Sequence, residues 1–291
     1  MTLFLQLSIS GLCVGLVYAT VAMGLMLLFR AAGVMNFAQG NILAMGAYFG
    51  FALADKVGMT NPVLMILVGI VYFIIFGIIL GSVCFLPFKR SKWPQAMLIC
   101  TLGAGIVINQ LCQILVTTMV RPLAPIISGT LLIGSVSIHY QYLFIFAIMI
   151  LMLVGLYFLF ERTYCGRVMT ATSMNRYAAD LIGIPTDLVT IVTFCLVVMM
   201  TGFSGWLLAP IYYVSQNLIT FQARAFASLV VGGMGALKGP IVGGIIIGLI
   251  EAYSTFFTTT YTDVVVFGCL LLMLAVKPSG IFSAAVIKEK A

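Results

Sequence analysis

The sequence predicts an all-α, polytopic integral membrane protein with a single transmembrane domain over residues 1–291, and three observations support this fold class. First, 63% of the residues are hydrophobic and only 7% are charged, whereas soluble domains carry about 25% charged residues. Second, the mean hydropathy is +1.23. Third, apolar runs of roughly the length that crosses a bilayer follow one another along the chain. No polar segment is long enough to form a separate soluble domain.

The apolar runs predict about nine membrane-spanning helices, within a range of about eight to ten. Proline, glycine and charged residues separate these runs, which lie at about 4–29, 41–54, 62–86, 95–119, 141–160, 188–209, 222–234, 240–257 and 263–276. The runs at 41–54 and 222–234 are short, which is typical of broken or half-buried helices that line a cavity.

Basic residues predict which loops face the cytoplasm. They cluster after the third run, in the long loop after the fifth run and in the C-terminal tail: Lys89, Arg90 and Lys92; Arg162, Arg167 and Arg176; Lys277, Lys288 and Lys290. This arrangement places the N-terminus outside. Because the first basic residue is Arg30, the N-terminal segment lacks the positive region of a signal peptide, and we expect the first run to remain as a span. The net charge of +7 comes from these helix-end residues and does not indicate a nucleic-acid partner.

Several amide side chains and one convincing carboxylate lie inside the apolar runs. A carboxylate at bilayer depth costs about 2.5–3.5 kcal/mol, so Glu251 is expected to face protein or water. Buried amides either bond neighbouring helices or line a substrate path, and both interpretations stay open. The candidate path residues are Asn36, Gln39, Asn41, Asn109, Gln113 and Glu251.

Glycine is frequent in the C-terminal third at spacings that place small residues on one helix face. Ordinary packing within the chain is the simpler explanation, and a pore-side or subunit-side seam is the alternative. The glycines concerned are Gly232, Gly233, Gly235, Gly239 and Gly243.

No catalytic, metal or nucleotide-binding constellation is present in the sequence. His139 has no clustered partner ligands, and a zinc site needs three or four. The seven cysteines show no CxxC pairing and are typical of small apolar packing residues. A glycine-rich loop ending in Lys-Ser or Lys-Thr is missing, so we expect this chain to bind no cofactor and to hydrolyse no ATP itself.

The long loop at 161–187 is the most polar interruption of the chain. A helix is predicted over Val168–Ile182, with Gly183 as its stop and Pro185 preventing its continuation. Thr186 or Asp187 is expected to cap the next span.

The predicted loop helix has two contrasting faces. Ala171, Met174, Ala178 and Leu181 form an apolar stripe, whereas Thr172, Arg176 and Asp180 lie on the opposite face. The spacing allows Arg176 and Asp180 to pair, although an acid before the base would be the better order. An interfacial helix on lipid would carry more lysines and large aromatic residues. Docking to a cytoplasmic protein is therefore favoured over lipid anchoring.

Four segments in order, covering about residues 11–282, resemble the permease subunits of branched-chain amino acid importers of the LivH/LivM type. The first runs from Gly15–Ala19 through Asn36–Gly40 to Gly46–Tyr48, and the second from Gly166–Arg167 to Ala178–Ile184. The third comprises Phe226–Ala227, Gly232–Gly235, Gly239–Pro240 and Gly248–Ala252, and the fourth is Lys277–Phe282.

The resemblance implies a permease in a bacterial cytoplasmic membrane, working with a second identical or homologous permease subunit. Two cytoplasmic ATPases would bind ATP and Mg, and an extracytoplasmic binding protein would deliver branched-chain or related amino acids. The second segment would be the coupling loop that engages the ATPase. Its implied contact residues are Gly166, Arg167, Ala171, Thr172, Asn175, Arg176, Ala178, Ala179, Leu181 and Gly183.

Two positions depart from the family pattern. Gln39 stands where the family often has histidine, which removes a titrating side chain. Met174-Asn175 precedes Arg176 where a Gln-Asp pair is common, which removes a negative charge from the docking face.

The alternatives are an importer permease for a sugar, an amide or urea, a proton-coupled secondary transporter using Glu251, and a non-transporting scaffold subunit. The coupling-loop resemblance argues against the last two.

Overall fold

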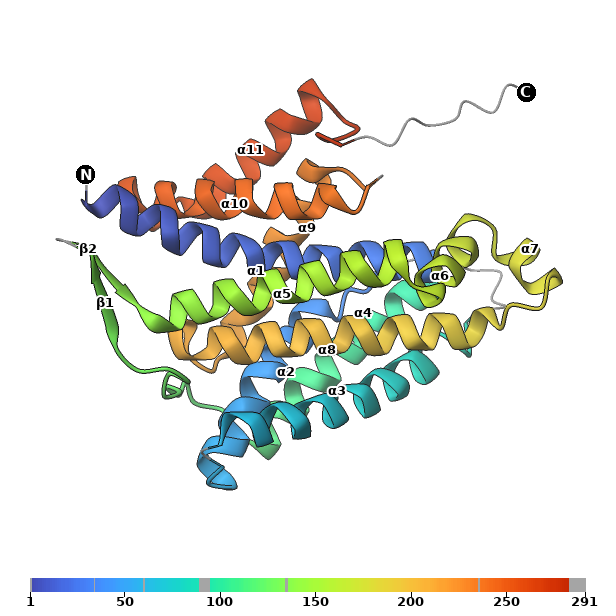
Figure 1. The fold of residues 1–291 in the computed structure, drawn as a ribbon, viewed down its shortest axis with the longest axis horizontal. Coiled ribbons are helices and arrows are strands. Elements are labelled where there is room, and N and C mark those ends of the chain that lie inside the picture. Colours follow the sequence, from blue (N-terminus) through green and yellow to red (C-terminus); the bar gives the residue numbers. More distant parts are fainter. Residues whose placement is uncertain are drawn as a thin grey trace. The chain divides into compact units, whose positions relative to one another are not determined.

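A computed structural model describes residues 2–33, 35–59, 61–88, 95–133, 136–234 and 236–282 (Figure 1). The basic residues Lys89, Arg90, Lys92, Lys288 and Lys290 and the predicted packing residue Gly235 lie outside this part. The helices of the N-terminal half are α1 (Thr2–Ala32), α2 (Gln39–Phe51), the π-helical turn η1 (Ala52–Lys56), α3 (Pro62–Cys84), α4 (Gln95–Leu115) and α5 (Tyr140–Arg162). Those of the C-terminal half are α6 (Tyr164–Met174), α7 (Arg176–Leu181), α8 (Thr186–Tyr212), the 3-10 turn η2 (Gln216–Thr220), α9 (Phe221–Gly232), α10 (Lys238–Phe257) and α11 (Thr262–Val276).

Each predicted apolar run corresponds to a helix in the described residues, with bounds that agree to within a few positions. Six helices are long and apolar enough to cross a membrane, namely α1, α3, α4, α5, α8 and α10. The others that match apolar runs, α2, α9 and α11, are shorter. The helical, multi-pass character is thus supported, whereas the predicted count of about nine spans is not confirmed.

The connection between α4 and α5 contains a β-hairpin that the all-α prediction did not include. Strand β1 (Thr130–Ile133) pairs antiparallel with β2 (Val136–His139), with Thr130 opposite His139 and Leu131 opposite Ile138. The alternating pattern Val136-Ser137-Ile138-His139 is typical of a half-buried strand. His139 thus lies at the end of a strand and not in an irregular loop.

The chain divides into two compact units, each described by itself. The first, which we call the α8 unit, comprises Leu27–Ile126 and Leu151–Gln222. Within it α8 packs against both α2 and α3. The α2–α8 contact is close because a side chain at Gly46 would lie 1.9 Å from the carbonyl oxygen of Gly202. Nearly every residue of α2 is buried, so this short helix forms the centre of the unit.

The second unit, the α10 unit, comprises Met1–Met26, Ile127–Ile150 and Ala223–Ala291. Its helices α1 and α10 meet at glycines, since a Cβ at Gly248 would lie 2.3 Å from the Cα of Gly15. Three of the predicted packing glycines, Gly232, Gly239 and Gly243, lie where α9 approaches α10. Gly233 has a φ of +96°, and the chain around residues 279–282 passes directly beside it.

Candidate functional site

The long loop folds into two short helices because Asn175 interrupts the predicted one. Its backbone is extended (φ −152°, ψ 100°), and its side-chain oxygen accepts a hydrogen bond from the Ala178 N–H at 3.0 Å. Asparagine favours this capping geometry over a helix interior. Similarly, Thr163 caps α6 by accepting from the Gly166 N–H. The prediction of one continuous helix over Val168–Ile182 is therefore wrong.

The predicted stop lies at the expected position. Gly183 has a φ of +84°, and its N–H donates to the Asp180 carbonyl while the Ile184 N–H donates to the Ala179 carbonyl. This is the pattern by which glycine ends helices.

The expected cap of the next helix is absent, because both candidate residues hold α7 instead. Thr186 donates its hydroxyl hydrogen bond to Asp180 at 2.6 Å. Asp187 pairs with Arg176 at 2.8 Å, so Arg176 and Asp180, which the spacing would allow to pair, have different partners. The Arg176 guanidinium lies 4.7 Å from the ring centroid of Phe85. Polar contacts thus fasten α7 to the start of α8, beside a cavity of about 600 Å³ lined by Arg176, Tyr177, Asp180 and Pro185–Leu188.

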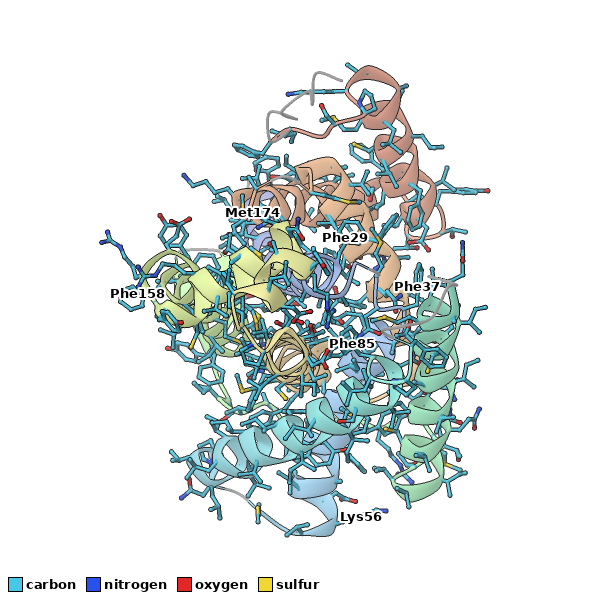
Figure 2. The ribbon with its side chains drawn as sticks, turned by 90° about the vertical axis from the view of Figure 1, so that its right-hand side faces the viewer. Phe29, Phe37, Lys56, Phe85, Phe158 and Met174 are labelled. Atoms are coloured by element: carbon cyan, nitrogen blue, oxygen red, sulfur yellow. The ribbon has the colours of Figure 1, made fainter. Side chains whose placement is uncertain are left out.

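The loop also exposes apolar side chains. Tyr177, Leu181 and Ile182 are 74%, 70% and 76% exposed, and Met174, labelled in Figure 2, is 83% exposed. With the exposed Ala178 we call these five residues the apolar loop surface. Of the residues predicted to contact an ATPase, five are exposed, two are partly exposed and three are buried. In that order they are Arg167, Asn175, Ala178, Leu181 and Gly183; Ala171 and Arg176; and Gly166, Thr172 and Ala179.

Polar groups at the start of α2 satisfy one another inside the α8 unit. Asn36 donates to Gln39 at 3.3 Å, and Gln39 donates to the Thr201 hydroxyl of α8. The Gly40 N–H donates to the Gln222 side chain at 2.8 Å, which satisfies a helix-end donor. Asn36 and Gln39 are 2% and 0% exposed. In this conformation Gln39 joins α2 to α8, whereas Asn36 bonds locally to Gln39 and to the Ala38 N–H.

A second amide stripe lies along α4. The Asn41 side chain closely approaches Gly105, and Asn109 and Gln113 follow Gly105 at steps of four residues on one face. Within the described residues, the buried Asn109 Oδ1 and Gln113 Nε2 have no hydrogen-bond partner. Buried polar atoms are usually satisfied, so these two are suited to water or substrate when the helices move.

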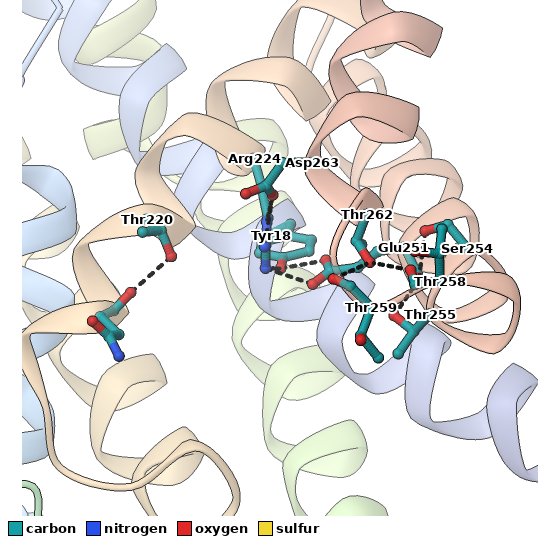
Figure 3. Close-up of polar contacts among 11 residues, drawn as sticks. Tyr18, Thr220, Arg224, Glu251, Ser254, Thr255, Thr258, Thr259, Thr262 and Asp263 are labelled. Carbon is teal, nitrogen blue, oxygen red and sulfur yellow. Dashed lines mark hydrogen bonds and ion pairs between the residues drawn. The ribbon is translucent and has the colours of Figure 1, made fainter.

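The α10 unit contains a charged cluster that joins four helices (Figure 3). Arg224 of α9 donates from Nη1 to Glu251 Oε1 of α10 at 2.5 Å, and the Tyr18 hydroxyl of α1 donates to Glu251 Oε2 at the same distance. Arg224 also pairs with Asp263 of α11 at 2.8 Å. Tyr18 is fully buried, and the Arg224 and Glu251 side chains are 15% and 12% exposed. Glu251 is therefore held by protein partners, as its cost at bilayer depth requires.

The sequence interpretation identified Glu251 but missed Arg224 and Tyr18. Arg224 lies within the short apolar run at 222–234. When an arginine and a glutamate each interrupt a different apolar run, an ion pair between them is favoured, because burying either charge unpaired in a membrane costs free energy. That complementarity was the available signal.

Comparisons with known proteins agree with one another. A family model described as "Branched-chain amino acid transport system / permease component" matches residues 7–275. The high-affinity branched-chain amino acid transport system permease proteins LivH of Salmonella typhimurium and Escherichia coli are each 30% identical over 98% of this chain and 97% of their own length. BraD of Pseudomonas aeruginosa, described in the same words, is 28% identical over 98% of both chains.

A solved structure supports the fold alone. PsaBC from Streptococcus pneumoniae in complex with Fab matches with a TM-score of 0.53 and 14% identity, over 95% of this chain and 92% of that one.

Proposed function

The chain belongs to the family of branched-chain amino acid transport permeases, and we propose that it forms the membrane path of an ATP-binding-cassette importer for branched-chain or related amino acids. The main observation that supports this proposal is the family match over residues 7–275. The structured loop at 161–187, with its exposed apolar side chains, adds to it. The importer would lie in a bacterial cytoplasmic membrane. A second permease subunit, identical or homologous, would complete the path.

The apolar loop surface supports a protein partner at the cytoplasmic end. Its side chains are exposed at the tip of a structured, capped loop, whereas the charges of α7 are used internally by Asp187 and Thr186. Exposed apolar patches of this kind mark protein interfaces. We assign this surface to one of two cytoplasmic ATPases, which carry the ATP and Mg. The ten predicted coupling residues remain proposals, with Ala178 and Leu181 best placed for contact.

The residues that we propose for the path are the amides of α2 and α4 in the α8 unit and Glu251 in the α10 unit. Asn36, Gln39 and Asn41 lie on or before α2, and Asn109 and Gln113 lie on α4. Amides offer donors and acceptors without a net charge, which suits a zwitterion that must also leave. Glu251 is paired with Arg224, which makes it a poor carrier of a coupling proton and disfavours a proton-driven transporter.

The decisive experiment reconstitutes the permease, its ATPases and its binding protein in proteoliposomes. Uptake of leucine, isoleucine, valine, small amides, urea and sugars is measured with and without ATP. We expect ATP-dependent uptake of the branched-chain amino acids. ATP-dependent uptake of a sugar alone, or transport by the isolated chain under a proton gradient, would contradict the proposal.

A variant pair tests the docking surface. Ala178→Arg places a charge on the apolar loop surface and is expected to abolish ligand-stimulated ATP hydrolysis without preventing membrane insertion. Thr170→Arg is the matched control, because Thr170 is exposed on α6 but lies outside that surface. If ligand stimulates ATP hydrolysis equally in the Ala178→Arg and Thr170→Arg variants, the apolar loop surface is not the ATPase docking site.

A further inference from the structure

The charged cluster of the α10 unit has an inner side and an outer side with different properties. On the inner side, Arg224 Nη1 contacts Glu251 at 2.5 Å and the Tyr18 hydroxyl at 3.2 Å. Both Glu251 carboxylate oxygens accept hydrogen bonds, from Arg224 and from Tyr18. These buried contacts fix the position of the guanidinium, so its remaining edge has a set direction.

The outer edge of Arg224 carries Nε and Nη2, and both donate to a single oxygen of Asp263, Oδ1, at 3.3 and 2.8 Å. This edge has the fork geometry that binds a carboxylate through two parallel hydrogen bonds. Asp263 uses one oxygen where two would fit, and its side chain is 62% exposed. The Arg224–Asp263 contact is therefore the exchangeable part of the cluster, since exposed ion pairs contribute little stability.

From this geometry we propose that Arg224 and Asp263 form a receiving site for the zwitterionic head group of an α-amino acid. The ligand carboxylate takes the Nε–Nη2 edge of Arg224, and the ligand ammonium pairs with the displaced Asp263 carboxylate. Glu251 and Tyr18 act as positioning residues that hold Arg224. This inference rests on the proposed importer function and assigns its head-group specificity.

The charge count favours a zwitterion over a simple anion or cation. One guanidinium and two carboxylates give the cluster a formal charge of −1. An anion at Arg224 would make the total charge of the cluster −2 and would leave the Asp263 carboxylate facing a like charge, which is unfavourable at low dielectric. A zwitterion leaves the total unchanged and produces an alternating series: Glu251, Arg224, ligand carboxylate, ligand ammonium, Asp263.

The surroundings of Asp263 suit an apolar side chain. Tyr261 lies two residues before it and Val264 follows it directly, and they are 62% and 66% exposed; Phe257 at the end of α10 is 82% exposed. With the N-terminus outside, the end of α10 and the start of α11 face the extracytoplasmic side, where a binding protein delivers its ligand. A branched aliphatic side chain would lie against these residues while its head group exchanges with Asp263.

Direct ligand binding is tested on the assembled permease–ATPase complex without the binding protein. Binding to the folded state raises the unfolding midpoint. Millimolar leucine is expected to raise the midpoint of the wild-type complex, and leucinamide and 4-methylpentanoate, which each lack one charge, should raise it less. Arg224→Lys keeps the charge but loses the fork, and Asp263→Asn loses the ammonium partner, so both should lose the leucine shift.

Matched controls separate this site from general effects. Arg121→Lys changes an exposed arginine outside the cluster, and Asp55→Asn removes an exposed carboxylate from the other unit. Both are expected to keep the leucine shift. No shift in the wild type at any millimolar concentration, or an equal shift in Asp263→Asn, would overturn the assignment.

Uptake into proteoliposomes at saturating leucine-loaded binding protein gives the second readout. Loss of a charge-assisted hydrogen bond should lower leucine uptake about tenfold or more in Arg224→Lys and Asp263→Asn. Wild-type uptake in both variants would refute the receiving site while leaving the importer function intact. If the wild-type complex imports no amino acid, the proposed function itself fails.

Discussion

Replacing Arg224 with methionine should destabilise the α10 unit strongly, because it removes one partner of a buried ion pair. The Glu251 side chain is 12% exposed and would keep only the Tyr18 hydroxyl of its two side-chain donors. Breaking a buried pair from one side costs about 3–5 kcal/mol, since the remaining charge stays desolvated. Asp263→Asn touches the same arginine but at a carboxylate that is 62% exposed, and should cost less than about 1 kcal/mol.

The assay is the unfolding midpoint of the purified complex in lipid nanodiscs, followed by tryptophan fluorescence and light scattering. A loss of this size corresponds to a decrease on the order of 10 °C. The double variant Arg224→Met/Glu251→Met removes both buried charges and should recover most of that loss, because an apolar pair of similar volume can replace a buried ion pair. The reasoning is refuted if Arg224→Met melts with the wild type, or if the double variant is as unstable as the single one.

Two further predictions concern backbone features. Asn175→Ala removes the cap of α7 and should cost about 1 kcal/mol locally, seen as faster amide hydrogen exchange in α7 and weaker ATPase stimulation; unchanged exchange would show that the Arg176–Asp187 and Thr186–Asp180 contacts hold α7 without the cap. Gly46→Ala places a methyl group 1.9 Å from the Gly202 carbonyl oxygen and should sharply reduce the yield of folded protein, whereas Gly155→Ala, which meets no atom within 4 Å, should not. Equal yields would mean that α2 and α8 can separate freely.

Helix positions could be predicted from the sequence because apolar runs and their Pro, Gly and charged breaks are local signals. The stop at Gly183 is one example, since a left-handed residue followed by Pro185 ends a helix without help from other parts of the fold. These local signals do not determine the number of membrane-spanning helices. Helices such as α2 and α9 are too short for length alone to decide whether they cross the bilayer.

Side-chain partners were predicted less well because they depend on how distant segments meet. Arg176 and Asp180 have helical spacing and both lie on α7, but each has its partner at the start of α8, Asp187 and Thr186 respectively. Helical periodicity describes neighbours within one helix, whereas these partners lie on the next one. It also missed the break at Asn175, whose side-chain oxygen accepts from the Ala178 N–H. The ion pair between Arg224 and Glu251 could not be predicted from helical periodicity for the same reason, because the two residues lie on different helices.

The two candidate functional regions differ in how they are stabilised, and this difference bears on what each can do. The loop at 161–187 is held by caps and a half-exposed ion pair, each worth about 1 kcal/mol, so α7 can shift at little cost if a partner moves it. The Glu251–Arg224–Tyr18 contacts are buried, and an apolar replacement would serve stability about as well. Burying these charges in a membrane is costly, and folding does not require them. Recognition of the charged head group of a zwitterionic substrate does require them, and it best explains why the cluster is present. The Arg224→Met/Glu251→Met variant separates these roles, because it should fold in the membrane and fail to import leucine.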